Sequence, residues 1–178
     1  DGGQHRRRDD HDHAGSQRSM TAVVSLGSNV GDRLALLRRG LEVLSMHLPV
    51  VALSGVYETA AVGVTDQPDF LNLVATLGGD DPETAFVAAQ AAETAQGRLR
   101  SHRWGPRSLD VDVIDVDGRV TDDPRLTLPH PRAMERAFVL VPWLEIDPVA
   151  ELPRLGPVRA LVARLDTSDV RRVGGAPR

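Results

Sequence analysis

Apolar and polar positions along the chain follow two different periods, one typical of strands and one typical of helices. Short apolar or β-branched runs predict strands at residues 21–26, 50–57, 70–77 and 109–116. Leucines recur at helical spacing from residue 34 to residue 44, and they predict a helix that is capped by Asp32 and ends near His47. A second, alanine-rich helix is expected to begin at Asp81-Pro82-Glu83 and to end near Gln96.

The predicted order of elements is β-α-β-β-α-β, which is typical of the ferredoxin-like sandwich, an α+β fold with one sheet beneath two helices. A turn-rich stretch at 121–135, an apolar segment at 138–146 and a short helix near Pro157 follow this core. We expect them to form extra C-terminal strand and helix elements. The fold by itself does not decide a function, because many unrelated activities use it.

The two ends of the chain differ from its middle. Residues 1–19 contain no large apolar side chain and mix Arg, Asp, His and Gly. Such a segment buries too little surface to offset the entropy of ordering, and it predicts a disordered tail. We expect a single domain over residues 20–170, followed by a flexible tail at 171–178.

Composition excludes several classes of chemistry. All 21 basic residues are arginine, and the chain has neither lysine nor cysteine. A Walker A loop and a Schiff-base enzyme both need lysine, and thiol catalysis needs cysteine, so these classes are excluded. The net charge is -4, and no apolar run is long enough to span a membrane. We expect a monomeric cytoplasmic protein that binds neither nucleic acid nor membrane.

Asp110 and Asp112 are the first candidate site. Side chains at i and i+2 of a strand project from the same face, so these two carboxylates are expected side by side. Hard oxygen ligands on an open face suit Mg²⁺, which also takes phosphate oxygens as ligands. The alternative is an exposed strand with a polar face. Asp115 and Asp117 are expected on the other face and near a turn, exposed to solvent.

An arginine-rich loop precedes this strand. Arg98, Arg100, Arg103 and Arg107 stand there with Trp104, between glycines. Guanidinium groups grip phosphate oxygens bidentately, so the loop is either a clamp for a polyphosphate or a solvated segment.

Three further polar positions are candidates. His130 lies between prolines, with arginines on both sides, so it is either a structural residue of a turn or part of a phosphate site. Asn72 lies inside a predicted strand, where asparagine is disfavoured, and an amide there could read the edge of a heterocycle. Phe70 shares its face and could stack on a flat ring. Glu93 is expected to be solvated or capping unless it lines the same cleft.

Five segments of the chain together resemble one family. They are SLGSNVGDR (25–33), YET (57–59), QPDFLN (67–72), RWGPRSLDVDVI (103–114) and LTLPHPRAMERAFVL (126–140). In this order they strongly resemble the 6-hydroxymethyl-7,8-dihydropterin pyrophosphokinases of the folate pathway. The resemblance implies a ferredoxin-like fold and transfer of the β,γ-diphosphate of ATP to the hydroxymethyl oxygen of the pterin, with AMP as the second product.

The resemblance also implies roles for individual residues. Asp110 and Asp112 would hold two Mg²⁺ ions, and Arg100 and Arg107 would contact the phosphates during transfer. The pterin-binding residues implied are Thr59, Ala60, Val62, Phe70, Asn72 and Phe138. The ATP-binding residues implied are Gln90, Glu93, Arg98, Arg100, Trp104, Arg107, Ile114, Arg125, Thr127, His130 and Arg136.

Two other functions remain as alternatives. A nucleotidyltransferase would use Gly27-Ser28 with Asp110 and Asp112, although that class keeps these motifs close in sequence and about eighty residues separate them here. A non-catalytic ferredoxin-like module that binds a ligand or RNA would display aromatic residues on a basic face. The low aromatic content and the acidic balance of the chain argue against it.

Overall fold

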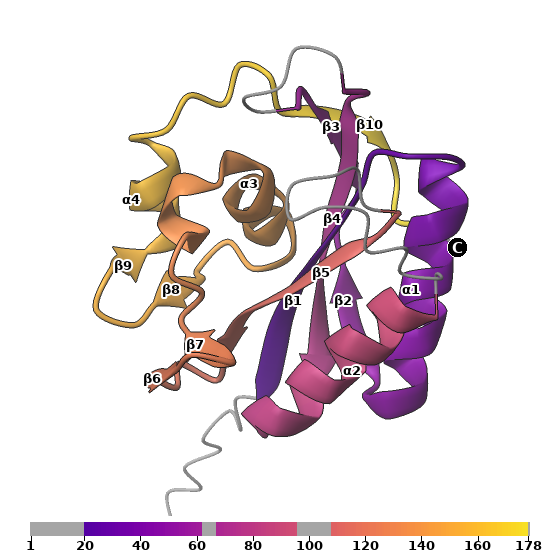
Figure 1. Ribbon diagram of the computed structural model, residues 1–178. Helices are drawn as coiled ribbons and strands as arrows, with labels where there is room; N and C mark the ends of the chain where they lie inside the picture. Colours follow the sequence, from indigo (N-terminus) through magenta and orange to yellow (C-terminus); the bar gives the residue numbers. More distant parts are fainter. Residues whose placement is uncertain (1–19, 62–66, 96–107, 178) are drawn as a thin grey trace, which may run out of the picture.

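The computed structural model describes residues 20–61, 67–95 and 108–177. Its centre is a six-stranded sheet with the order β10-β3-β4-β1-β5, in which β2 also pairs with β4 (Figure 1). All of these pairings are antiparallel. The strands of this sheet are β1 (Thr21–Ser28), β2 (Val50–Leu53), β3 (Val56–Thr59), β4 (Phe70–Gly78), β5 (Asp110–Val116) and β10 (Arg171–Gly174). The predicted strand-and-helix order of the core is confirmed.

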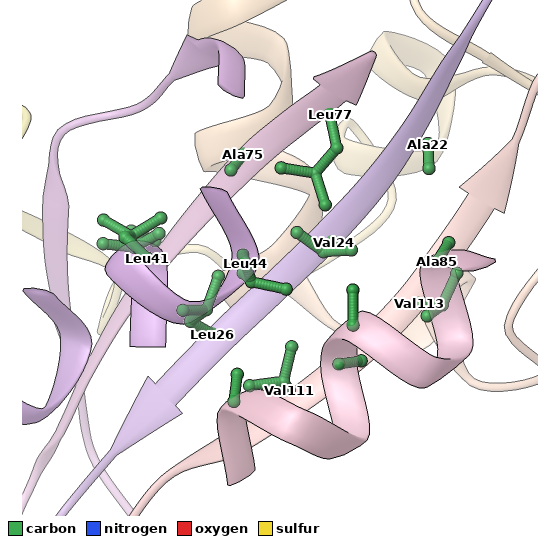
Figure 2. Packing of buried hydrophobic residues seen from close by; sticks show 14 of the residues in the cluster. Ala22, Val24, Leu26, Leu41, Leu44, Ala75, Leu77, Ala85, Val111 and Val113 are labelled. Carbon is green, nitrogen blue, oxygen red and sulfur yellow. The ribbon is translucent and has the colours of Figure 1, made fainter. Parts of the chain in front are cut away.

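Helices α1 (Arg33–His47) and α2 (Pro82–Thr94) cover one face of the sheet (Figure 1). Both begin as predicted, because Asp32 accepts a hydrogen bond from the Ala35 N–H and Asp81 accepts one from the Thr84 N–H. Alanines of α2 and leucines of α1 pack on inward-facing residues of β1, β4 and β5. Figure 2 shows this core, with Leu41, Leu44, Ala85, Val24, Leu26, Ala75, Leu77, Val111 and Val113 among its members.

The opposite face of the sheet carries the C-terminal half of the chain. Helices α3 (Ala137–Ile146) and α4 (Val158–Val162) lie there (Figure 1), as does the short 3-10 helix η1 (Ala133–Glu135). A second core of buried residues, among them Val74, Ile114, Leu140 and Trp143, joins these helices to the sheet. The remaining strands form two hairpins, β6 (Thr121–Asp123) with β7 (Leu126–Leu128) and β8 (Glu151–Leu152) with β9 (Gly156–Pro157).

The predicted strand at residues 50–57 is divided into β2 and β3. Ser54 separates them: its backbone N–H donates to the Val74 carbonyl, and its Oγ accepts from the Val74 N–H at 2.9 Å. Gly55 follows at a point where β10 comes very close. A Cβ on Gly55 would lie 2.7 Å from the Gly174 carbonyl oxygen, so no other residue type fits there without displacing β10.

The prediction of a flexible tail from residue 171 is wrong for its first residues. Arg171–Gly174 form β10, which pairs with β3 and places Arg171 opposite Glu58. Two ion pairs hold β10 in place, from Arg171 to Glu58 at 2.8 Å and from Arg172 to Glu145 at 3.1 Å. The segment has a partner strand that lies more than a hundred residues earlier, so its local sequence does not reveal the pairing.

The expectation that Asp115 is solvated is also wrong, because its side chain is only 6% exposed. The pairing of β5 with β1 shifts so that Val23 lies opposite Asp115 and Val24 lies opposite Val113, which leaves Ile114 as an extra residue. This bulge breaks the alternation of side chains along β5. Asp115 accepts a hydrogen bond from the Gly118 N–H, and burial raises the pKa of its carboxyl.

None of the helices in the described part of the chain has both the length and the apolar character that crossing a lipid bilayer requires.

Candidate active site

Two carboxylates on strand β5 form the centre of the candidate site. Asp110 and Asp112 are both partly exposed, whereas Val111 and Val113 between and beyond them are buried beneath α1 and α2. The predicted arrangement, with two carboxylates on one face and apolar residues on the other, is confirmed. Because β5 ends one side of the sheet order, the two carboxylates lie at the edge of the sheet.

Two cavities meet at these carboxylates. The larger cavity has a volume of about 780 Å³ and the smaller one about 330 Å³. Asp110 and Asp112 line both of them, and no other described residue is shared between the two. Ligands bound in the two cavities would therefore meet at these two side chains.

The larger cavity combines two aromatic rings with a buried amide. Phe70 of β4 and Phe138 of α3 line it, together with Asn72, Thr59 and Ala60. Asn72 is 3% exposed, and its Nδ2 donates to Thr59 Oγ1 at 2.9 Å. The expectation that Phe70 and Asn72 share one face of β4 is confirmed. Two aromatic rings beside one oriented amide suit a flat heterocycle with polar edges.

A glycine beside this amide leaves room for the amide oxygen at the cavity wall. Gly27 of β1 pairs with Asn72 of β4 and lines the same cavity. A Cβ at Gly27 would lie 3.0 Å from Asn72 Oδ1 and 3.8 Å from Phe70 Cδ1. The absence of a side chain at position 27 therefore keeps the amide oxygen in place.

The smaller cavity is lined by polar residues from α2 and from the segment around the β6–β7 hairpin. Five of the residues implied for ATP binding lie on it, namely Gln90, Glu93, Arg125, Thr127 and His130. Glu93 lines this cleft and also accepts a hydrogen bond from the Val111 N–H at 3.1 Å, which ties α2 to β5. Arg125 is exposed and pairs with Glu83 and Asp123.

Two other residues implied for ATP binding lie elsewhere. Ile114 is fully buried in the core beneath α3, because the alternation of β5 places it on the same face as Asp112, farther along the strand. Its backbone carbonyl accepts a hydrogen bond from the His130 N–H at 2.8 Å, so it positions the His130 segment instead of lining the cavity. Arg136 lines the larger cavity.

Asp112 has two basic neighbours. Arg136 Nη1 donates to Asp112 Oδ2, and His130 Nε2 lies 3.7 Å from Asp112 Oδ1. Burial lowers the pKa of His130, and the charge of Arg136 acts in the same direction while Asp112 opposes it. The guanidinium carbon of Arg136 also lies 5.7 Å from the centre of the Phe138 ring. Arg136 thus connects a carboxylate at the boundary with a ring of the larger cavity.

The carboxylate pair fits a hard divalent cation. Both side chains are partly exposed and project from one face, at the point where the two cavities join. Mg²⁺ is commonly held by one or two carboxylates, with its remaining positions taken by water and by phosphate oxygens of the substrate. The described residues offer two such ligands, with open space on both sides.

Several residues named from the sequence lie outside the described part of the chain. They are Val62 of the pterin set and Arg98, Arg100, Arg103, Trp104 and Arg107 of the arginine-rich loop. Their predicted roles stay predictions.

The sequence did not indicate one part of the larger cavity. Asp166, Ser168, Asp169 and Val170 line it, although they belong to a segment without a recognisable motif. Their position follows from the pairing of β10 with β3, a contact between residues far apart in the sequence. A pairing of this kind has no local signal.

Comparison with known proteins gives one consistent result. Residues 23–148 match the family model described as 7,8-dihydro-6-hydroxymethylpterin-pyrophosphokinase. A 2-amino-4-hydroxy-6-hydroxymethyldihydropteridine pyrophosphokinase of Mycobacterium tuberculosis is 44% identical over 170 residues, covering 84% of this chain and 87% of that protein. An enzyme of the same name from Methylorubrum extorquens is 42% identical over 156 residues, covering 85% of this chain and 98% of that protein.

Solved structures are similar at the level of the fold. The wild-type HPPK-DHPS of Plasmodium falciparum matches 82% of this chain with a TM-score of 0.62 and 13% sequence identity. The match covers 44% of that longer chain, so this protein spans less than half of it. At this identity the likeness supports the α+β architecture.

Proposed function

The chain belongs to the 7,8-dihydro-6-hydroxymethylpterin-pyrophosphokinase family, and from this membership we propose how its two cavities divide the reaction. The activity of the family is ATP-dependent transfer of a diphosphate group to 6-hydroxymethyl-7,8-dihydropterin, a step of folate biosynthesis, and it is the activity of this chain. The β- and γ-phosphates leave ATP as one unit, so the products are the pterin diphosphate and AMP.

One observation carries the division of roles: Asp110 and Asp112 line both cavities. We propose that ATP occupies the smaller, polar cavity and that the pterin occupies the larger one. In-line transfer needs the attacking oxygen and the phosphorus atom within a few ångströms of each other. A boundary made of two shared carboxylates supports such an encounter, with each substrate entering from its own side.

The two carboxylates are proposed to hold two Mg²⁺ ions. When bound, these ions would neutralise phosphate charge and lower the pKa of the hydroxymethyl group. Arg136, which pairs with Asp112 in the free protein, must release that oxygen if the carboxylate is to bind a cation. Its guanidinium group would then be available to a phosphate oxygen at the boundary, where arginine binds in a bidentate manner.

On the nucleotide side, His130 is proposed to act as a neutral hydrogen-bond donor. Burial lowers its pKa, which favours the uncharged ring. Its Nδ1 accepts a hydrogen bond from the Arg132 N–H at 3.1 Å, which leaves the ring proton on Nε2. Nε2 lies on the Asp112 side of the ring and would donate to a phosphate oxygen. Arg125 and Thr127 would provide further donors.

On the acceptor side, Phe70 and Phe138 are proposed to enclose the pterin ring. Asn72 has one amide hydrogen engaged with Thr59, which fixes the orientation of the amide. Its carbonyl oxygen and second hydrogen are then presented in a defined direction, and a buried amide of this kind discriminates strongly by hydrogen bonding. The backbone at Thr59 and Ala60 would read the same edge of the ring.

The remaining features of the site and of the protein are also proposals. Arg100 and Arg107 are proposed to contact the transferred phosphates, and Val62 is proposed to lie against the pterin. The requirement for two ions rather than one is a further proposal. A monomeric state and a cytoplasmic location complete the proposal.

Mass spectrometry of the products tests this function. The protein is incubated with ATP, Mg²⁺ and 6-hydroxymethyl-7,8-dihydropterin, and the expected products are AMP and a pterin that carries two added phosphates. Release of ADP would indicate single phosphoryl transfer, and an adenylated product with free pyrophosphate would indicate a nucleotidyltransferase. Either result, or the absence of turnover, would refute the proposal. Addition of excess EDTA is expected to stop the reaction, and restored Mg²⁺ to recover it.

A further inference from the structure

The larger cavity has a wall from the C-terminal part of the chain. Residues 166–170, here called the C-terminal wall, contribute Asp166, Ser168, Asp169 and Val170 to its lining. This wall lies beyond residues 23–148, the part that matches the family model. It stands with Phe70 and Phe138 around the space proposed for the acceptor. Its contribution to binding is therefore separate from that of the motifs that identify the family.

Strand β10 anchors the C-terminal wall to two of the elements that line the larger cavity, β3 and α3. It follows the wall directly and pairs with β3, the strand that ends at Thr59 (Figure 1). Arg172 of β10 pairs at 3.1 Å with Glu145 of α3, the helix that also carries Phe138. Glu145 in turn accepts hydrogen bonds from Tyr57 Oη and from the Gly55 N–H. The wall is thus connected to both sides of the cavity.

The charges around this cavity are unbalanced. Its described lining contains five carboxylates and two guanidinium groups, from Asp110, Asp112, Glu135, Asp166, Asp169, Arg132 and Arg136. Arg136 pairs with Asp112, and Arg132 lies 3.7 Å from Glu135. Among the described residues, neither Asp166 nor Asp169 forms an ion pair. Within the described part of the chain, the wall therefore adds two carboxylates without an ion-pair partner at the rim of the cavity.

Asp166 is ionised at neutral pH. Its Oδ1 accepts a hydrogen bond from the Ser168 N–H at 2.9 Å. Hydrogen bonding to the side chain and the backbone of Ser168 lowers the pKa of this carboxyl below its ordinary value. The same hydrogen bond closes a turn within the wall, so the carboxylate is held in position by its own segment.

We infer that the C-terminal wall is part of the acceptor-binding site and that Asp166 and Asp169 make this site discriminate against anionic ligands. The inference rests on the proposed function, which places the pterin in this cavity. The acceptor alcohol carries no phosphate, whereas the product carries a diphosphate with several negative charges. Fixed carboxylates at the rim repel the product and leave the binding of the neutral acceptor almost unchanged.

The first experiment removes the two charges and keeps the shape of the wall. The double variant Asp166→Asn with Asp169→Asn is compared with Glu42→Gln with Glu151→Gln, which removes two exposed carboxylates that line neither cavity. The dissociation constant of the pterin diphosphate is measured by equilibrium titration on the full-length proteins. Exposed charges contribute little individually, so the wall variant is expected to bind the product roughly 2- to 10-fold more tightly than the control variant at low salt.

Salt provides the diagnostic feature of this experiment. Exposed charges are screened over about 10 Å at 0.1 M salt and over about 3 Å at 1 M. The difference between the two variants is therefore expected to vanish near 1 M salt. Equal product affinities at low salt, or a difference that persists at high salt, would overturn the electrostatic part of the inference.

A second variant tests the wall itself. Val170→Ala removes apolar surface from the half-buried side chain of the wall, and the KM for the pterin is expected to rise about threefold. The KM for ATP is expected to match that of the wild type. Equal effects on both substrates, or no effect on either, would show that the wall is not part of the acceptor site. If the wild type formed no pterin diphosphate at all, the proposed function would fail, a result distinct from either outcome.

Discussion

Replacing Gly27 by alanine is expected to weaken pterin binding more than a clash of the same size elsewhere in the sheet would. The new Cβ would lie 3.0 Å from Asn72 Oδ1, closer than the roughly 3.5–4.0 Å at which non-bonded atoms attract best. The amide has little freedom to move away, because it is buried and its Nδ2 is bonded to Thr59. The methyl group would therefore displace the carbonyl oxygen that is proposed to bind the pterin.

The size of the effect follows from the hydrogen bond at risk. A net hydrogen bond contributes about 0.5–1.5 kcal/mol, and each 1.4 kcal/mol is a factor of ten in affinity. The KM for the pterin is thus expected to rise about 2- to 13-fold in Gly27→Ala. Stability is expected to fall, since the methyl group must displace a buried, hydrogen-bonded amide, and the smaller entropy loss of alanine on folding offsets only part of that cost.

The matched control is Gly78→Ala, at the far end of β4. A Cβ there would meet Pro49 Cγ at the same distance of 3.0 Å, but Gly78 lines neither cavity. Steady-state kinetics would determine KM for the pterin and for ATP in both variants, with thermal unfolding measured in parallel. The reasoning is refuted if Gly27→Ala leaves the KM for the pterin at the wild-type value, or if Gly78→Ala raises it equally.

Three further predictions concern the carboxylates and the aromatic pair. Asp110→Asn or Asp112→Asn is expected to lower the rate of AMP formation at least about 100-fold, while the circular dichroism spectrum stays unchanged. The reason is that a cation stabilises phosphate charge by several kcal/mol. Near-normal turnover in either variant would contradict the metal assignment. Phe70→Ala is expected to raise the KM for the pterin about tenfold and the KM for ATP less than twofold, and equal rises would exclude stacking. Asp115→Asn is expected to raise the unfolding temperature at pH 7. Burial raises the pKa of Asp115 in the folded state, so its protonated form stabilises the fold at low pH. This contribution is lost as the pH rises through that pKa. The gain should shrink toward pH 4, and a gain independent of pH would contradict this cause.

The sequence predicted features that depend on local chemistry. Helix α1 begins at its aspartate cap, and α2 begins at Asp81-Pro82, because these residues satisfy N–H groups that any helix start leaves unpaired. Phe70 and Asn72 share a face because β4 is regular over its whole length. These predictions use contacts within a few residues, which a single sequence contains in full.

Features that depend on distant contacts could not be predicted in the same way. Strand β10 pairs with β3, and there Arg171 and Arg172 meet Glu58 and Glu145, residues that no periodicity connects with the C-terminus. The C-terminal wall of the larger cavity follows from this pairing. The approach of β10 also explains why residue 55, which follows Ser54 in the break between β2 and β3, is a glycine. One unpredicted pairing therefore accounts for this glycine and for a wall of the site.

Three aspartates of β5 show how one extra residue changes the chemistry of a strand. Asp110 and Asp112 precede the bulge, project from one face of the edge strand and remain partly exposed, so both can reach a cation. Asp115 follows the bulge and would have projected with Val113 toward α1 and α2 in a regular strand. The bulge instead places it opposite Val23, within the second core, where burial raises its pKa. Ile114 is the extra residue of this bulge, and its carbonyl accepts a hydrogen bond from the His130 N–H. The same bulge thus has two effects. It buries the carboxyl of Asp115, which costs stability, and it contains the carbonyl that positions His130 beside Asp112.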